Sequence, residues 1–257
     1  MSSGLVSIVC PTHNCEKFIN ETITCVLNQS YIDFELLIVD DNSADRTVEI
    51  IKKYKDQRIK LFVNESNKGA AFSRNLAISK AQGKYIAFLD GDDIWTPNKL
   101  SDQITFMEQN NFDFTYTDYE VVDEAGKSLG IYFTGPKKVT HKMFLRIDYI
   151  GTSTVIYKRE VYPNLQIPEN ILKRNDDAMW LLLSKKCDCY LLKGIYSKYR
   201  KNAGSISSGK KIRLFKYHVE LYKKLYGWKS FKAYYYSFKN VLFYILKQIS
   251  FRKKLRW

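Results

Sequence analysis

The sequence predicts an α/β protein with a mostly parallel central sheet and helices on both faces of that sheet. The first observation behind this prediction is that apolar, β-branched runs alternate four times with segments of helical periodicity within residues 5–110. The second is that the 257 residues are 45% hydrophobic and 26% charged, which is ordinary for a protein with one large core. The third is that no run of about 18 apolar residues interrupts the pattern, so we expect no transmembrane helix.

The first predicted strand covers residues 5–11 (LVSIVCP), where β-branched residues suit a buried strand. Residues 16–29 place their apolar side chains at helical spacing and predict the first helix. Ser43 or Asp45 is the expected N-cap of the second helix, and Gly83 is expected to end the third. The same criteria predict the remaining elements of this half, which are strands at 35–41, 59–64 and 84–90 and helices at 45–55, 70–81 and 99–110.

Beyond residue 110 the alternation becomes irregular. Residues 112–123 alternate like a strand, and residues 124–129 (EAGKSL) predict a turn. Residues 151–162 predict a strand followed by the start of a helix, and residues 178–187 predict a buried helix. We expect this half to complete the same domain and to cover its site.

The charge is concentrated at the C-terminal end. Residues 210–257 hold 14 Lys or Arg and one acid, Glu220, whereas residues 1–209 hold 27 basic and 26 acidic residues. The same segment carries 14 of the 38 aromatic residues. Basic helices with aromatic residues on one face lie in membrane interfaces, so we expect a domain at 1–209, a helical extension at 210–257 and an anionic membrane surface as its partner. The alternative is a helical pair packed on the body with a solvated basic face. No motif suggests nucleic-acid binding.

Cysteine usage and the N-terminus indicate a cytoplasmic protein. The five cysteines match no zinc spacing, and we expect them to be reduced thiols. The first residues, MSSGLVSIVCPTHN, lack the basic and apolar regions of a secretory signal. Together with the basic extension, these features predict a peripheral protein on the inner face of the cell membrane.

Three predicted strands end in polar residues: PTHN (11–14), VDDNSADRT (39–47) and LDGDD (89–93). In open α/β sheets, ligands bind outside the carboxyl ends of the strands. Because these three ends are expected at the same edge of the sheet, the sequence predicts a ligand site there.

The stretch LDGDD carries three acids. Asp90, Asp92 and Asp93 suit a hard cation such as Mg²⁺ or Mn²⁺, which takes oxygen ligands and bridges to phosphate oxygens. Gly91 lets the backbone turn tightly between them. The alternative is a helix N-cap with spare acids.

The other two strand ends suit a nucleotide. One of Asp40 and Asp41 can accept hydrogen bonds from a base or ribose while the other caps the next turn; the alternative is that both serve the turn. Pro11, Thr12 and His13 stand where a base can pack, although His13 can equally be structural.

Charged residues elsewhere add candidates for phosphate binding and for catalysis. Arg74 and Lys68 can offset phosphate charge, although solvation explains Lys68 equally well. Asp176 and Asp177 precede a buried helical run, so each is either a cap or the general base that accepts a proton from an acceptor hydroxyl. The residues alone leave this choice open.

Four segments together resemble the family 2 glycosyltransferases of the GT-A fold, close to enzymes of bacterial teichuronic acid, capsule or lipopolysaccharide synthesis. They are PTHN, VDDNSADRT, NKGAAFSRN and YIAFLDGDDIW, in the family's order and spacing, and the similarity covers roughly residues 5–210. The resemblance implies an inverting transfer of a sugar from a nucleotide donor, usually a UDP-sugar, to a glycan or lipid-linked acceptor.

The resemblance also implies roles for the acids. The family's DxD element falls on Asp90, Gly91 and Asp92, with Asp92 the first choice of metal ligand and Asp93 beside it. The nucleotide-contacting acid falls on Asp41, after Asp40. The opening motif falls on Pro11, Thr12, His13 and Asn14, where the family usually has Tyr in place of His13.

The family's catalytic base lies four residues before a Trp. Counting back from Trp180 gives Asp176 as first choice, with Asp177 in reserve and Asn175 in place of the usual Glu.

A later family element resembles YRKNAGSIS (199–207). Here Asn202 replaces a His that helps at the metal in some relatives, and Arg200 and Ser205 are possible contacts near the leaving phosphate.

Two further function classes remain. A nucleotidyltransferase would carry a Gly-rich, Arg-containing loop after the first strand, which PTHNCEKF lacks. A catalytically silent nucleotide-sugar-binding or membrane-associated protein is the main alternative. Acceptor contacts are expected within residues 130–160, with Thr152, Ser153 and Thr154 as weak candidates.

Overall fold

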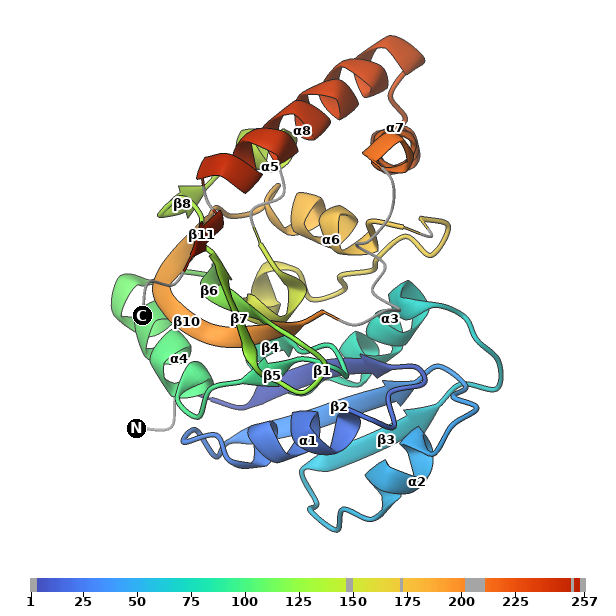
Figure 1. Cartoon of the computed structure of the whole chain (residues 1–257), viewed down its shortest axis with the longest axis vertical. Helices are drawn as coiled ribbons and strands as arrows, with labels where there is room; N and C mark the ends of the chain where they lie inside the picture. The colour runs from blue at the N-terminus through green and yellow to red at the C-terminus, as the bar shows by residue number, and fades with distance from the viewer. Residues whose placement is uncertain (1–3, 147–149, 172, 202–210, 251, 255–257) are drawn as a thin grey trace.

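The computed structural model describes residues 4–146, 150–171, 173–201, 211–250 and 252–254. A central sheet runs through the molecule with helices on both sides, and two long C-terminal helices lie at one end (Figure 1). The strand order along the sheet is β11-β7-β6-β9-β4-β1-β2-β3, with β10 pairing to β5, β6 and β8. The predicted α/β class with a central sheet is therefore confirmed.

The N-terminal half of the sheet is parallel. Each strand is followed by a helix that crosses to the next one, which is the arrangement that parallel pairing requires. β1, β2 and β4 are buried almost throughout because helices cover both faces, whereas the edge strand β3 is half-buried. The elements are β1 (Val6–Thr12), α1 (Ile19–Leu27), β2 (Phe34–Asp40), α2 (Thr47–Lys52), β3 (Ile59–Val63), α3 (Ala70–Lys80) and β4 (Tyr85–Phe88).

The second half extends the same sheet with mostly antiparallel pairs. β9 pairs antiparallel with β4 and β6, and β6 pairs antiparallel with β7 but parallel with β10. The elements are β5 (Ile94–Trp95), α4 (Lys99–Asn110), β6 (Phe114–Val122), β7 (Ser128–Phe133), β8 (Lys138–Val139), α5 (His141–Phe144), β9 (Ile156–Lys158), α6 (Asn175–Leu183), β10 (Cys189–Arg200), α7 (Lys211–Tyr226), α8 (Ser230–Ser250) and β11 (Arg252–Lys254), with 3₁₀ turns at Thr152–Thr154 and Arg159–Val161.

The structure corrects several expected boundaries. The helix expected at 178–187 begins earlier, at Asn175. The second helix has Arg46 at its N-cap, while the Asp45 carboxylate accepts a hydrogen bond from the Thr47 N–H at 2.9 Å. Gly83 does not end α3, which stops at Lys80. A Cβ on Gly83 would lie 2.6 Å from the Leu5 carbonyl oxygen, so glycine is needed there for the close approach to the first strand.

The sheet separates two apolar cores, since successive residues of a strand point to opposite faces. Val9 and Phe88 belong to one core, together with residues of α3, α6 and α7. Ile8 and Ala87 belong to the other, together with residues of α1 and α4. The five cysteines, expected as reduced thiols, are free.

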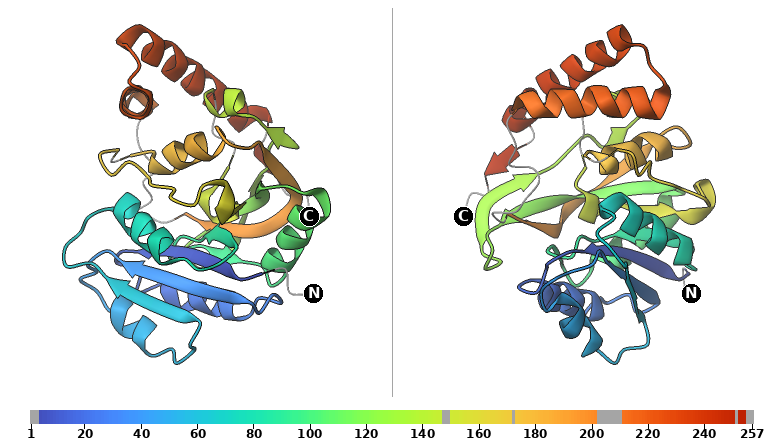
Figure 2. Two further views of the ribbon diagram at one scale, coloured as in Figure 1. Left: turned by 180° about the vertical axis from the view of Figure 1, so that it is seen from behind. Right: turned by 90° about the vertical axis from the view of Figure 1, so that its right-hand side faces the viewer.

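The C-terminal helices pack on the body. Val219, Leu221 and Tyr222 of α7 join the core that contains α6, and the Tyr222 hydroxyl donates to the Leu145 carbonyl at 2.9 Å. Figure 2 shows α7 and α8 side by side at the end of the molecule opposite α2. The expected domain boundary at 209/210 falls within 202–210, outside the described residues.

In the described part of the chain, no helix has both the length and the hydropathy to cross a membrane.

Lys99 is a buried amine whose titration can be measured. Its side chain is 0% exposed, its Nζ donates to Gln103 Oε1 at 2.8 Å, and the same nitrogen lies 4.3 Å from the centre of the Trp95 ring. Burial lowers the pKa of Lys99 well below its ordinary value of 10.5.

We therefore expect Lys99→Met to reduce the pH dependence of stability. Below pH 10.5 the unfolded chain binds a proton that the folded chain has released, so the stability of the native protein rises with pH in the window between the lowered pKa and 10.5. Urea unfolding at several pH values should give the native chain a slope steeper than that of the variant by up to about 1.4 kcal/mol per pH unit. Equal slopes would show that Lys99 stays charged when folded.

Candidate active site

The three polar strand ends meet at one edge of the sheet, as predicted. The Asp41 N–H donates to the Thr12 carbonyl at 2.8 Å, which joins the ends of β1 and β2. A Cβ on Gly91 would lie 2.7 Å from Thr12 Cγ2, so the loop after β4 packs directly against the end of β1. Glycine at position 91 therefore serves close approach.

The Asp40 carboxylate stabilises the turn that follows β2. The side chain is 0% exposed, and its carboxylate accepts hydrogen bonds from Thr12 Oγ1 at 3.1 Å and from the Ser43 N–H at 2.8 Å. Asp40 is therefore the acid that caps the turn after β2, and the alternative in which both acids serve this turn is wrong, because the Asp41 carboxylate binds elsewhere.

The Asp41 carboxylate forms hydrogen bonds with a different loop, the one that leads into α3. Its Oδ1 accepts from Asn64 Nδ2 and from the Lys68 N–H, both at 2.8 Å, and its Oδ2 accepts from the Gly69 N–H at 2.7 Å. Gly69 is the N-cap of α3 with φ 88°, a left-handed conformation that suits glycine. The Asp41 carboxylate, 4% exposed, therefore fixes the start of α3.

His13 is held in one tautomer. Its Nδ1 lies 2.9 Å from the Asp41 carbonyl oxygen, which can only accept, so Nδ1 carries the hydrogen. The other nitrogen, Nε2, then accepts from Asn14 Nδ2 at 3.1 Å and from Asn67 Nδ2 at 3.2 Å. The ring is exposed and fixed in direction at the rim of the site.

Arg74 joins the end of β4 to the start of α6. One terminal nitrogen donates to Asp90 Oδ1 at 2.6 Å, and the other donates to Asn175 Oδ1 at 2.9 Å. The Arg74 side chain is 7% exposed. Burial alone would lower the pKa of its guanidinium, but the carboxylates of Asp90 and Asp176 raise it above its ordinary value. Two acids from distant parts of the chain therefore converge on one buried cation.

Asp93 points into the protein. Ser153 Oγ donates to its Oδ2 at 2.5 Å, and the Arg200 N–H donates to its Oδ1 at 3.0 Å. Burial, followed by the nearby charges of Asp92 and Asp90, raises the pKa of Asp93 well above its ordinary value. Of the three acids expected at the metal, Asp93 thus lies behind the loop as a support, whereas Asp90 and Asp92 are only partly buried.

Arg200 is also a support. Its side chain is 1% exposed; Nε donates to the Asp92 carbonyl at 2.8 Å, and NH1 donates to the Glu124 carbonyl at 2.6 Å. NH2 forms an ion pair with Glu21 of α1. We expected a contact near the leaving phosphate, but the guanidinium is instead turned inward, where it fixes the backbone of Asp92.

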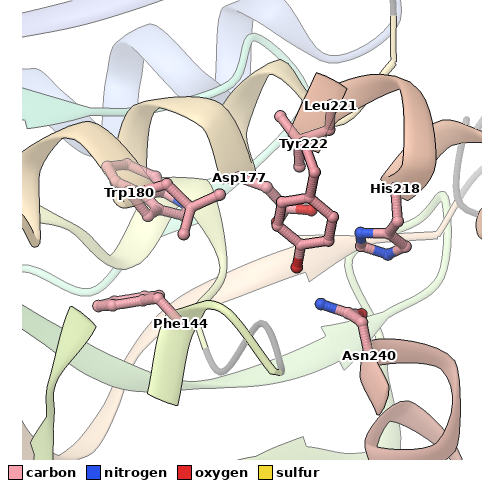
Figure 3. A pocket seen from close by; sticks show the side chains of 8 residues that line it. Phe144, Asp177, Trp180, His218, Leu221, Tyr222 and Asn240 are labelled. Carbon is pink, nitrogen blue, oxygen red and sulfur yellow. The ribbon is translucent and has the colours of Figure 1, made fainter. Parts of the chain in front are cut away.

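The two candidates for the catalytic base lie on different sides of α6. Asp177 is 6% exposed and forms an ion pair with Arg174. Figure 3 shows Asp177 beside Tyr222 and His218 in a small pocket between α6 and the C-terminal helices. Asp176 lies about 100° around the helix from Asp177. Its carboxylate charge helps to raise the pKa of Arg74, at the edge where the strands end.

The pocket of Figure 3 is too small to be the predicted nucleotide site. Its lining is mostly aromatic and aliphatic, and its free space holds about one water molecule, which is far too small for a nucleotide. The converging strand ends form an open surface of polar groups.

The segment expected to contact the acceptor supports the acidic loop. Ser153 and Thr154 are buried, and Ser153 Oγ also accepts from the Asp90 N–H at 3.1 Å. Thr152 is half-buried. Ser153 and Thr154 therefore have structural partners in place of the expected acceptor contacts.

The oxygens present suit a hard cation that brings further ligands. In the described ranges, no three His, Cys, Asp or Glu side chains come together to hold a metal by themselves. Asp90 uses Oδ1 for Arg74 and is 33% exposed, and Asp92 is half-buried beside it. One or two carboxylates, with phosphate oxygens and water, are the usual ligands of Mg²⁺ in nucleotide enzymes.

Sequence reasoning missed Glu21 and Asn64 and gave Ser153 a different role. None of the three carries a motif of its own, and only the fold brings them to Arg200, Asp41 and Asp93 respectively.

For three other predicted positions the structure leaves the role open. Lys68 is exposed, with its Nζ 4.5 Å from the centre of the Phe72 ring. Asn202 and Ser205 lie outside the described residues.

The chain matches a known protein family and several curated proteins. The model of glycosyl transferase family 2 matches residues 7–163. The chain is 40% identical over 212 residues to the UDP-Glc:alpha-D-GlcNAc-diphosphoundecaprenol beta-1,3-glucosyltransferase WfgD of Escherichia coli, covering 82% of each chain. It is 39% identical over 209 residues to the putative teichuronic acid biosynthesis glycosyltransferase TuaG of Bacillus subtilis, covering 80% of this chain and 82% of TuaG.

The fold is also that of solved structures. The crystal structure of S. aureus TarS 1–349 in complex with UDP superposes with a TM-score of 0.70 at 20% identity, covering 96% of this chain and 72% of TarS. This likeness supports the GT-A architecture, and the family match covers the three strand ends that form the site. The chain belongs to glycosyl transferase family 2.

Proposed function

We propose that the protein is an inverting glycosyltransferase that moves a sugar from a UDP-sugar to a lipid-linked acceptor during synthesis of a bacterial surface polysaccharide. The observation that carries this proposal is the contact of Arg74 with both Asp90 and the start of α6, which brings an acid of the DxD element and the candidate base to one edge. The names of WfgD and TuaG support the substrate classes, because these relatives align over most of their length.

The nucleotide would lie across the ends of β1 and β2. Residues 11–14 offer the base a rim with the fixed, exposed His13 ring. Asp41 holds the backbone of Lys68, whose exposed ammonium can swing to the diphosphate. Electrostatic contacts of this kind are worth most where charge develops on the leaving group.

Mg²⁺ or Mn²⁺ would be held by Asp92, with Asp90 adjacent and Asp93 supporting the loop. When bound, such an ion neutralises charge on the diphosphate oxygens. Arg74 keeps Asp90 in place, and the Arg200 guanidinium keeps the Asp92 backbone in place.

Asp176 would act as general base. Its carboxylate would take the proton of the acceptor hydroxyl as the oxygen attacks the anomeric carbon opposite the leaving diphosphate, and this single in-line displacement inverts the configuration. The Arg74 cation attracts Asp176 toward the site without a direct role in the proton transfer.

The alternative is a catalytically silent nucleotide-sugar-binding protein. The feature that favours it is Asn175, which stands where the family usually has Glu. In this chain, however, the Asn175 amide oxygen accepts from Arg74 at 2.9 Å and so retains a contact across the site. Release of UDP from UDP-sugars that depends on an acceptor would reject the silent alternative.

A lipid-linked acceptor also suggests a location. Because such acceptors are held in the bilayer, we place the protein in the cytoplasm, at the inner face of the bacterial cell membrane, as a peripheral component.

Asp176→Asn should abolish transfer while donor binding persists. We expect the rate of UDP release with acceptor to fall by at least about a hundredfold, because the amide cannot accept the proton. UDP-sugar affinity, measured by calorimetry with Mn²⁺ present, should change by less than about threefold.

The matched control is Asp177→Asn, one residue along the same helix. Because Asp177 faces α7, this variant should lose stability but keep its turnover within about fivefold. Normal transfer by Asp176→Asn, or the larger loss from Asp177→Asn, would reject the assignment.

Arg200→Met tests whether a buried cation positions Asp92. Loss of its contacts with Glu21 and the carbonyls should lower the free energy of unfolding by about 2–3 kcal/mol and raise the concentration of Mn²⁺ needed for half-maximal activity.

Arg46→Met removes the same charge from the exposed pair with Glu16. Since the Arg46 side chain is 75% exposed, the cost in urea unfolding should stay below about 1 kcal/mol and the Mn²⁺ requirement should not change. Equal behaviour of the two variants would contradict a positioning role for Arg200.

A further inference from the structure

Within residues 230–242, helix α8 has several large apolar side chains on the side that faces solvent. The side packed on α7 carries Ala233, Ser237 and Asn240, which are 0%, 0% and 5% exposed. The opposite side carries Phe231 and Phe238, which are 87% and 64% exposed. A surface helix of a globular protein normally has the reverse distribution.

The exposed residues form one continuous stripe. They follow the helical spacing i, i+3, i+4, i+7 and i+11, so they lie on one side of the helix. Five of the eight large exposed hydrophobic residues among those described belong to it. The α8 stripe consists of Phe231, Tyr234, Tyr235, Phe238 and Leu242.

Lysines border the α8 stripe. Lys232 and Lys239 are seven residues apart and flank the same edge, and the Lys239 ammonium lies 4.3 Å from the centre of the Tyr235 ring. Between residues 215 and 242 there are six lysines and one acid, Glu220, which pairs with Lys224. Exposed aromatic residues beside cations suit a surface that is apolar inside and anionic at its boundary.

We propose that the α8 stripe and its flanking lysines dock the protein on an anionic phospholipid surface, with the α8 axis in the plane of the interface. The charge selects this occupant over a second copy of the chain, since pairing two stripes would bring like-charged lysines together. Aromatic side chains would enter the boundary between headgroups and acyl chains, while the ammonium groups would remain at the lipid phosphates.

The docking surface is joined to the helix that carries Asp176. In Figure 3, Tyr222 of α7 and Asn240 of α8 line the same pocket as Asp177 and Trp180 of α6. α8 lies outermost at this end of the molecule in the views of Figures 1 and 2. Docking would therefore hold α6 in a fixed relation to the bilayer; this last step rests on the proposed function, in which the acceptor is lipid-linked.

The test is co-sedimentation of the full chain with vesicles of phosphatidylcholine alone or with about one third phosphatidylglycerol. We expect binding to the anionic vesicles that weakens with salt, and at least tenfold weaker binding to the neutral ones. The double variant Phe231→Ser, Phe238→Ser should bind the anionic vesicles at least tenfold less tightly. Ile32→Ser, which removes another hydrophobic residue that is 75% exposed, should bind like the native chain.

Charge reversal supplies the second arm. The double variant Lys232→Glu, Lys239→Glu should bind the anionic vesicles at least tenfold less tightly. The matched control is Lys52→Glu, Lys53→Glu, which makes the same change in charge at the end of α2, on the opposite side of the molecule. This control should weaken binding less than threefold. Equal loss in the two pairs, native binding by the serine variant, no vesicle binding by the native chain, or a dimer in solution that the serine variant abolishes would overturn the proposal.

The result of the vesicle-binding test can be distinguished from the result of a test of the proposed function. UDP-sugar affinity should be unchanged in all four variants, and transfer to an acceptor presented in detergent should persist. Vesicle binding without any sugar transfer would support the docking surface and reject the transferase function. Sugar transfer without vesicle binding would support the transferase function and reject the docking surface.

Discussion

The site depends on one buried ion pair, between Arg74 and Asp90. Arg74 projects from α3, Asp90 lies in the loop after β4, and the second terminal nitrogen of Arg74 reaches Asn175 at the start of α6. A guanidinium buried to this degree requires carboxylates nearby, and acids crowded at a strand end require a cation. These contacts therefore join α3, the loop after β4 and the start of α6 at the edge where the strands end.

The acids of the candidate site divide into buried supports and partly exposed groups at the open edge. Asp93 lies behind the loop, paired with Ser153, and Asp41 fixes the start of α3 from which Arg74 projects. Asp92 and Asp176 remain partly exposed at the edge. Neutral N–H and O–H donors hold the carboxylates of Asp41 and Asp93, which in turn hold the start of α3 and the loop that carries Asp92. Such preorganisation lowers the cost of reorganisation during a reaction.

The sequence predicted the parallel half because its strands are continuous apolar runs that end in polar residues. Strand β10 was not predicted, since Lys193 and Gly194 interrupt its pattern and its pairing with β6 shifts register there. Spacing alone also could not separate Asp92 from Asp93 or Asp176 from Asp177, because the partners that distinguish them, such as Ser153, lie far away in sequence. The polar strand ends and the family resemblance predicted where the candidate site lies. Which of its acids support the loops and which remain partly exposed is seen only in the folded chain.

The most direct test of this account is a crystal structure of the protein with UDP and Mn²⁺, with the ion located by its anomalous scattering. The account requires the manganese peak within coordination distance of Asp92, with UDP across the ends of β1 and β2 and the Arg74–Asp90 pair intact. An ion bound away from Asp92, or UDP bound at another surface of the molecule, would contradict it.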